Sequence, residues 1–158
     1  MTGEPASIRT IVVPLDGSEK AERVVPAAIE ESRLHGAPLV LLRVVPYADP
    51  PPGLRSHGPE TTCSASPPEE IIDDCGLAEG YLRDVIARHA IAGGEIVVRY
   101  GDPFTQIAAE LGRWPGPLVV LASYATAVLP VGSHSEIARR IAGLDAFHVL
   151  LVPSAPGT

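Results

Sequence analysis

Residues 11–19 read IVVPLDGSE, a β-branched run that passes through a proline into a carboxylate, a glycine and a serine. Consecutive β-branched residues are typical of a buried strand, and the polar residues behind them suit a turn into a helix. The stretch therefore predicts a strand, a turn and a helix in direct succession. Asp16 stands immediately behind the strand.

The segment that follows, residues 18–36, is predicted to be a helix, because small and apolar residues recur at helical spacing and Gly36 is a natural stop. Pro26 lies inside this segment and lacks the amide donor, so we expect a kink or an end to the first turns there. A second, continuously apolar strand is expected over residues 39–45, interrupted only by Arg43.

The same alternation continues to the end of the chain. Residues 71–89 show helical periodicity, and the next helix is expected to open with Asp102 as its cap and Pro103 at its first position. The other expected elements are strands over 95–100, 118–122 and 147–152 and a short helix over 133–143. Strict alternation predicts right-handed crossovers and an α/β fold, a doubly wound, five-stranded parallel sheet with helices on both faces.

Composition agrees with this fold class and excludes several functions. Hydrophobic residues make up 46% of the chain and aromatic ones 4%, so aliphatic side chains must fill the core, as they do between buried parallel strands and helices. The net charge of -7 argues against nucleic-acid binding and gives no attraction to anionic membranes. The apolar runs are too short to cross a bilayer. We expect one domain over residues 1–158.

Residues 46–68 interrupt the pattern with seven prolines and no apolar periodicity. We predict a long, flexible surface loop within the domain, because too little apolar area is available to order it. A linker between domains is the alternative, but only one helix and two strands precede it.

The chain has two cysteines, Cys63 and Cys75, too few for a disulfide framework or a four-cysteine metal site. We expect both to be unpaired, which favours the reducing cytoplasm. The histidines show no metal-ligand spacing, and no metal site is expected.

In doubly wound sheets, ligands bind outside the carboxyl ends of the strands, where the strand order reverses. Asp16 lies at such an end and could accept hydrogen bonds from a ribose or orient a metal-bound phosphate. The alternative is that Asp16 caps the following helix, with Glu19 three residues later completing a capping box.

A second candidate group precedes the last helix, in the stretch Gly132-Ser133-His134-Ser135-Glu136. Its amides and hydroxyls stand at a helix N-terminus, where unpaired donors and the helix dipole could hold an anion. The alternative is again a capping box, with Ser133 as the cap and Glu136 reaching back.

Taken together, these stretches resemble the universal stress protein family over residues 11–152. The resemblance rests on residues 11–19, on LLRVVP at 41–46, YGDP at 100–103, GSHSE at 132–136 and the closing strand HVLLVP at 148–153. It implies a flavodoxin-like or adenine-nucleotide α-hydrolase-like sheet and, commonly, a homodimer paired through the last strand.

The ATP-binding branch of that family has a loop of the form G-x2-G-x9-G-[ST] after the fourth strand, and this chain departs from it. Ser123 and Thr126 stand where the first two glycines would fall, and five residues instead of nine separate Thr126 from Gly132. Side chains therefore stand at positions where the backbone of the loop needs to approach the nucleotide closely. Losing two charged contacts of about 1.5–3 kcal/mol each would weaken binding at least about a hundredfold.

The resemblance also implies a set of contacts for a bound nucleotide, ATP or AMP, with Mg²⁺ only alongside ATP. These contacts are Asp16 and Val44 at the ribose and base, Gly132, Ser133 and Ser135 at the phosphates, and Pro14, Leu15 and Ala122 as backbone walls.

Three functions follow as hypotheses. The first is a regulatory stress-response protein that acts through protein partners, with little catalysis and a degenerate or absent nucleotide site. The alternative is an ATP- or AMP-binding sensor with at most slow hydrolysis. The third is an enzyme that acts on another small molecule.

Overall fold

The computed structural model describes residues 7–46, 69–123, 134–144 and 147–153. Five strands within them form one all-parallel sheet in the order β3-β2-β1-β4-β5. The strands are β1 (Thr10–Leu15), β2 (Leu39–Pro46), β3 (Glu95–Gly101), β4 (Pro117–Ser123) and β5 (His148–Pro153). The predicted fold class is confirmed, and the strand order reverses between β1 and β4. The predicted loop lies outside the described residues from residue 47 to 68, and Pro46 ends β2.

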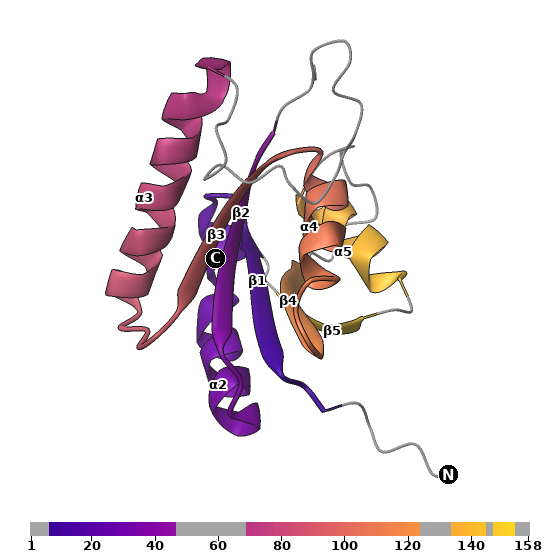
Figure 1. The fold of residues 1–158 in the computed structure, drawn as a ribbon. Helices are drawn as coiled ribbons and strands as arrows, with labels where there is room; N and C mark the ends of the chain where they lie inside the picture. The colour runs from indigo at the N-terminus through magenta and orange to yellow at the C-terminus, as the bar shows by residue number, and fades with distance from the viewer. Residues whose placement is uncertain (1–6, 47–68, 124–133, 145–146, 154–158) are drawn as a thin grey trace.

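Helices cover both faces of this sheet (Figure 1). The first three strands are added from the centre of the sheet toward one edge, in the order β1, β2, β3. The helices between them lie on one face of the sheet; they are α1 (Glu19–Glu22), α2 (Val25–His35) and α3 (Ile72–Arg88). The last two strands, β4 and β5, are added on the other side of β1. The helices that precede and connect them, α4 (Pro103–Leu111) and α5 (His134–Ala142), cover the other face. A 3-10 turn, Glu69–Ile71, precedes α3. Right-handed crossovers produce this segregation when the direction of winding changes.

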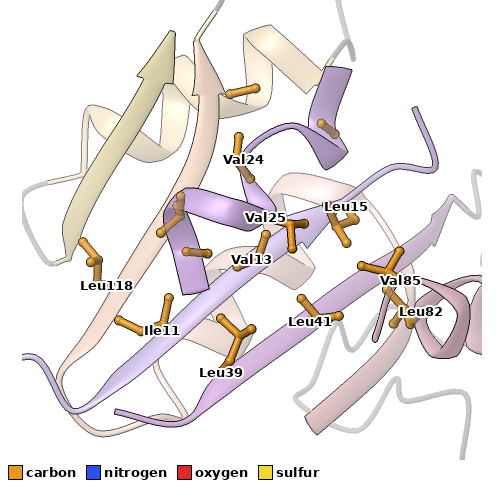
Figure 2. Packing of buried hydrophobic residues seen from close by; sticks show 14 of the residues in the cluster. Ile11, Val13, Leu15, Val24, Val25, Leu39, Leu41, Leu82, Val85 and Leu118 are labelled. Atoms are coloured by element: carbon orange, nitrogen blue, oxygen red, sulfur yellow. The ribbon is translucent and has the colours of Figure 1, made fainter. Parts of the chain in front are cut away.

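The core consists of two apolar layers, one on each side of the sheet. Ile11, Val13 and Leu15 of β1 pack against α2 and α3 (Figure 2), whereas Val12 belongs to the layer under α4 and α5. Successive side chains of a strand point to opposite faces, so both sets must be apolar when both faces are covered. This explains why the central strands are continuously hydrophobic in sequence.

The helix predicted over residues 18–36 is divided, as the position of Pro26 led us to expect. α1 ends at Glu22, and α2 begins at Val25 with the proline in its first turn. A first-turn amide has no partner within the helix, so proline loses no bond there, and its fixed φ suits the helix.

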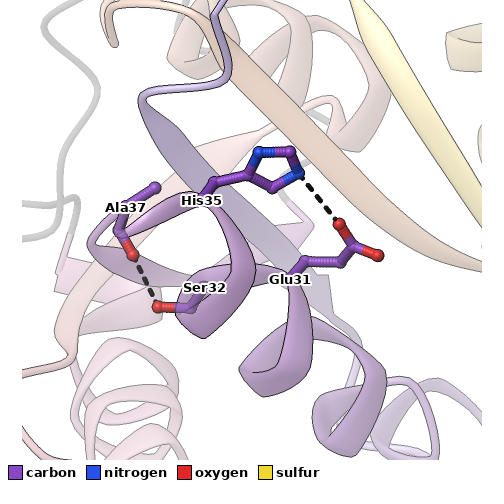
Figure 3. Close-up of polar contacts among 4 residues, drawn as sticks. All are labelled: Glu31, Ser32, His35 and Ala37. Carbon is purple, nitrogen blue, oxygen red and sulfur yellow. Dashed lines mark hydrogen bonds and ion pairs between the residues drawn. The ribbon is translucent and has the colours of Figure 1, made fainter.

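The end of α2 lies at Gly36, which has a left-handed conformation with φ 60° and ψ 32°. The amide of Ala37 donates to the Ser32 carbonyl at 3.0 Å, and the Ser32 hydroxyl donates to the Ala37 carbonyl at 2.5 Å (Figure 3). Nearby, His35 Nε2 lies 3.1 Å from Glu31 Oε2. Glycine tolerates a left-handed backbone, so the helix stops where the sequence predicts.

The prediction that both cysteines are unpaired is wrong for Cys75, which is disulfide-bonded. Cys75 is buried in α3 beside Val45, Ile71 and Ala78, and Cys63 lies outside the described residues. A single bridge depends on how closely two Cα atoms approach, which spacing in the sequence does not reveal. The argument from free thiols for a cytoplasmic location is thereby removed.

In the described part of the chain, no helix is both long enough and apolar enough to span a membrane.

Candidate ligand site at the strand ends

A crevice of about 210 Å³ opens at the carboxyl ends of β1 and β2, on the face that α4 and α5 cover. It lies beside the place where the strand order reverses, which is where doubly wound sheets bind ligands. The two strands and the residue after β1 contribute Pro14, Leu15, Asp16, Leu42, Arg43, Val44 and Pro46, and the helices contribute Pro103, Ile107 and Ile137.

Asp16 is the first residue after β1, and it is exposed at the rim of this crevice. Its Oδ1 accepts hydrogen bonds from the Ser18 amide at 2.8 Å and the Ser18 hydroxyl at 2.6 Å. Gly17, between them, has a φ of 89°, which the tight turn requires. The turn therefore fixes the position of the carboxylate.

The capping role predicted for Asp16 with Glu19 is wrong. Ser18 is the N-cap of α1, since its hydroxyl oxygen accepts from the Ala21 amide at 3.1 Å, and Glu19 is the first helical residue. A cap must reach the amide three positions on, and Asp16 stands two residues too early for that. Asp16 instead orients the residue that caps.

Val44 is buried in the apolar wall of the crevice, together with Leu42 from the same side of β2. Of the other residues predicted for the site, Pro14 and Leu15 line the crevice. Ala122 is buried in β4 and packs in the layer on the opposite face, outside the crevice walls.

The structure does not test the residues predicted for the phosphates. Gly132 and Ser133 lie outside the described residues, as does most of the shortened, glycine-poor loop, residues 124–131. Ser135 lies in the first turn of α5, and the structure does not describe its side chain. The proposed capping by Ser133 likewise stays a prediction.

Sequence reasoning missed the contribution of the helices. Pro103 and Ile107 stand one turn apart on α4 and both face the crevice, and Ile137 reaches it from α5. Residues four apart share a helix face, so the helical pattern after Asp102 could have indicated the α4 pair.

The two helices that wall the crevice also contact each other. The Arg140 guanidinium carbon of α5 lies 3.9 Å from the centre of the Phe104 ring of α4. Such a cation–π contact stabilises the packing of exposed helix ends by roughly 0.5–1 kcal/mol.

The chemical character of the crevice is an apolar interior with a carboxylate at its rim. Among residues 7–46, 69–123, 134–144 and 147–153, no group of three or more histidine, cysteine or acidic side chains could hold a metal ion. The walls can accept a flat apolar group, and Asp16 can accept hydrogen bonds from hydroxyls or amines.

Comparison with known proteins gives a consistent result. The chain matches the model of the Universal stress protein family over residues 7–143. The universal stress protein UspA from Lactobacillus plantarum has a similar structure, with a TM-score of 0.63 and 21% identity over 94% of this chain and 99% of that one. A universal stress protein from Burkholderia pseudomallei gives 0.53 and 23% over 96% and 99%.

Another similar structure is a universal stress protein in complex with cAMP, with a TM-score of 0.57 and 20% identity over 94% of this chain and 99% of that one. No curated protein matches the sequence. These structural likenesses show the fold, whereas the family match covers most of the sequence. The chain therefore belongs to the universal stress protein family.

Proposed function

We propose that this stress-response protein is regulatory, acts through protein partners and carries a degenerate adenine-nucleotide site. In this site the contacts for the nucleoside are retained and those for the phosphates are reduced. The observation that supports the proposal is the crevice between β1, β2 and α4, with Asp16 at its rim and Val44 in its wall.

The nucleoside would occupy the apolar interior. Val44, Ile107 and Ile137 offer aliphatic surface to a base, and the Asp16 carboxylate would accept from the ribose hydroxyls. Because Ser18 already holds that carboxylate in place, little ordering is required on binding. The volume of about 210 Å³ suits a nucleoside-sized ligand better than a larger one, since drug-sized pockets begin near roughly 300 Å³.

The phosphates of a bound nucleotide would make fewer contacts with the protein than its nucleoside. Serine and threonine replace the first two glycines of the pattern found in the ATP-binding branch, and the spacing to Gly132 is four residues shorter, five against nine. Added side chains at such positions keep the backbone amides away from the phosphate oxygens. The β- and γ-phosphates of ATP should therefore add little to the affinity of AMP.

The second candidate is a nucleotide sensor, and one observation favours it. A universal stress protein of similar fold was solved in complex with cAMP, a ligand with a single phosphate. A monophosphate needs few of the contacts that the altered loop lacks. If this chain is a sensor, a monophosphate is thus the class of ligand that suits it.

A second copy of the chain is one partner that we propose. β5 is an edge strand of the sheet, and Leu151 on it is 41% exposed. Unpaired strand edges with apolar side chains are usually covered in natural proteins. Pairing of two β5 strands would cover both edges at once.

A thermal-shift titration with adenosine, AMP, cAMP and ATP, each with and without Mg²⁺, tests the nucleotide site. Ligand at a hundred times its dissociation constant should stabilise the protein by about 2.7 kcal/mol. We expect similar shifts for AMP and ATP, no gain from Mg²⁺, and loss of the shift in Asp16→Asn.

The matched control is Asp73→Asn, which removes an exposed carboxylate from α3, away from the crevice. It should leave every shift unchanged. A large shift that needs both ATP and Mg²⁺ would favour a sensor with a working phosphate site. If none of the four ligands shifts the unfolding temperature, the proposed nucleotide site is contradicted.

A further inference from the structure

A second cavity, of about 470 Å³, lies on the opposite face of the sheet, between α3 and the carboxyl ends of β1 and β2. Its walls include Val45 and Arg43 from β2 and Ala78, Leu77 and Tyr81 from α3. The volume lies within the range of small-molecule pockets, roughly 300–1,000 Å³. It shares Arg43 and Pro46 of β2 with the crevice described above, but neither Asp16 nor Val44 lines it.

Arg43 is the positive charge of this cavity. Along β2 it lies two residues from Leu41 and two from Val45, so its side chain points to the same face of the sheet, the one that α2 and α3 cover. Nη1 donates to the Val44 carbonyl at 3.2 Å, and Nη2 would lie 3.9 Å from a Cβ placed on Gly17. The guanidinium therefore lies against the turn that follows β1.

This half-buried guanidinium has no carboxylate within 4.0 Å among the described residues. Arginine has five N–H donors in a planar fork that matches a carboxylate. The one hydrogen bond found for the Arg43 side chain in the described part of the chain goes to a carbonyl. An anion that enters the cavity would meet donors arranged to bind it.

The rest of the cavity is largely apolar. Val45 and Ala78 are buried at its floor, and Leu77 is 73% exposed at its edge. The Tyr81 hydroxyl donates a hydrogen bond to Glu22 Oε2 at 3.2 Å. Glu22 Oε1 in turn forms an ion pair with Arg88 Nη1 at 2.6 Å. A ligand with a hydrocarbon body could therefore bury it here.

One negative charge limits what the cavity can hold. Asp74, in the first turn of α3, contributes to the wall and would repel a second charge on the ligand. A dianion such as a phosphate monoester is therefore disfavoured relative to a monoanion. The guanidinium and the apolar floor suit a carboxylate with a hydrocarbon body, and Asp74 favours a single negative charge over two.

We propose that this cavity is a second ligand site, for a small organic monocarboxylate whose carboxylate binds Arg43 and whose hydrocarbon body contacts Val45 and Ala78. The inference goes beyond the proposed nucleotide site. It does not depend on that site, because the apolar residues of the two cavities, Val44 in one and Val45 and Ala78 in the other, belong to layers on opposite faces of the sheet.

Titration of hexanoate into the methyl-labelled protein, followed by NMR, tests this site. The methyl signals of Val45, Leu77 and Ala78 should shift and saturate, whereas those of Val44 and Ile137 should not. Hexanamide has the same length without the charge, and it should bind about tenfold more weakly or worse. Arg43→Met should weaken hexanoate binding by a similar factor and remove the preference over hexanamide.

Two further variants keep the result interpretable. Ile107→Val, whose side chain lines the first crevice and not this cavity, should leave hexanoate binding unchanged. Leu77→Ser alters an exposed side chain that folding does not require, and it should weaken hexanoate and hexanamide equally. The proposal is overturned if hexanoate gives no saturable shift, if both ligands bind equally, or if the shifts occur at Val44 and Ile137.

Discussion

Arg99 and Glu110 form a buried ion pair between β3 and α4, with side-chain exposures of 0% and 3%. Arg99 Nη1 lies 2.5 Å from Glu110 Oε2, and Glu110 Oε1 accepts from the Trp114 indole at 3.0 Å. Arg99→Met alone should lower the free energy of unfolding by about 3–5 kcal/mol, because it leaves a buried carboxylate without its partner.

The double variant Arg99→Met with Glu110→Leu removes both charges, so its free energy of unfolding should be close to that of the wild-type protein. Urea denaturation followed by the fluorescence of Trp114, the one tryptophan of the chain, measures both variants. Additive losses in the double variant would contradict the interpretation.

Tyr81 offers a test of the contacts between α1 and α3. Burial, and then the nearby Glu22 carboxylate that its hydroxyl binds, raise the pKa of Tyr81 to about 12. The folded protein thus retains a proton that the unfolded chain releases near pH 10. This contribution to stability is complete below about pH 10 and is lost as the pH rises toward 12.

Unfolding midpoints between pH 8 and pH 12, compared with those of Tyr81→Phe, isolate the contribution of Tyr81. The difference between the two proteins should shrink as the pH rises. A difference that stays constant would show that the phenol is not protected in the fold.

These residue-level features were the hardest to predict from the sequence. Arg99 stands in a largely apolar strand, where a charged residue is equally consistent with an exposed position, and its partner lies eleven residues away on another element. Asp16 was located correctly at the strand end, but the cap is Ser18, because the exact turn geometry at Gly17 decides which side chain reaches Ala21.

At the scale of elements, two glycines with opposite roles test how the helices are held. Gly36 ends α2 at φ 60°, where a Cβ would meet no atom within 4 Å but the backbone disfavours other residues. Gly80 lies inside α3, and a Cβ there also has open space. Gly36→Ala should destabilise the protein by about 1 kcal/mol, and Gly80→Ala should stabilise it by about 1 kcal/mol.

Chemical denaturation of both variants measures the effect, and each serves as the control for the other. The same sign for the two substitutions would contradict the assigned helix boundaries.

The elements themselves were the most predictable part of the molecule. Both faces of the central strands are covered, so these strands appear as continuous apolar runs, and glycine and proline mark the ends of α2 and the start of α4. The contributions of Ile107 and Ile137 to the crevice were missed, because they depend on how α4 and α5 lie over the sheet. The disulfide of Cys75 was missed for the same kind of reason, since it depends on proximity in space.

For the whole molecule, the exposed edge of the sheet predicts self-association. β5 is an edge strand, and Leu151 on it is 41% exposed. Light scattering at micromolar concentration should give the mass of a dimer, and Leu151→Lys should shift it toward the monomer, because a charge on an edge strand opposes pairing.

Leu34→Lys is the matched control, because this leucine is 75% exposed on α2, away from β5. It should leave the dimer intact. A monomeric wild-type protein at these concentrations would contradict pairing through β5.

The degenerate nucleotide site is tested most directly by the dissociation constants of AMP and ATP, measured by isothermal titration calorimetry with and without Mg²⁺. A crevice that retains its nucleoside contacts around Asp16 and Val44 but has lost phosphate contacts predicts two constants within about tenfold of each other. Both should weaken in Asp16→Asn. An ATP constant on the order of a hundredfold lower than that of AMP, the size expected from two intact phosphate contacts, would contradict it.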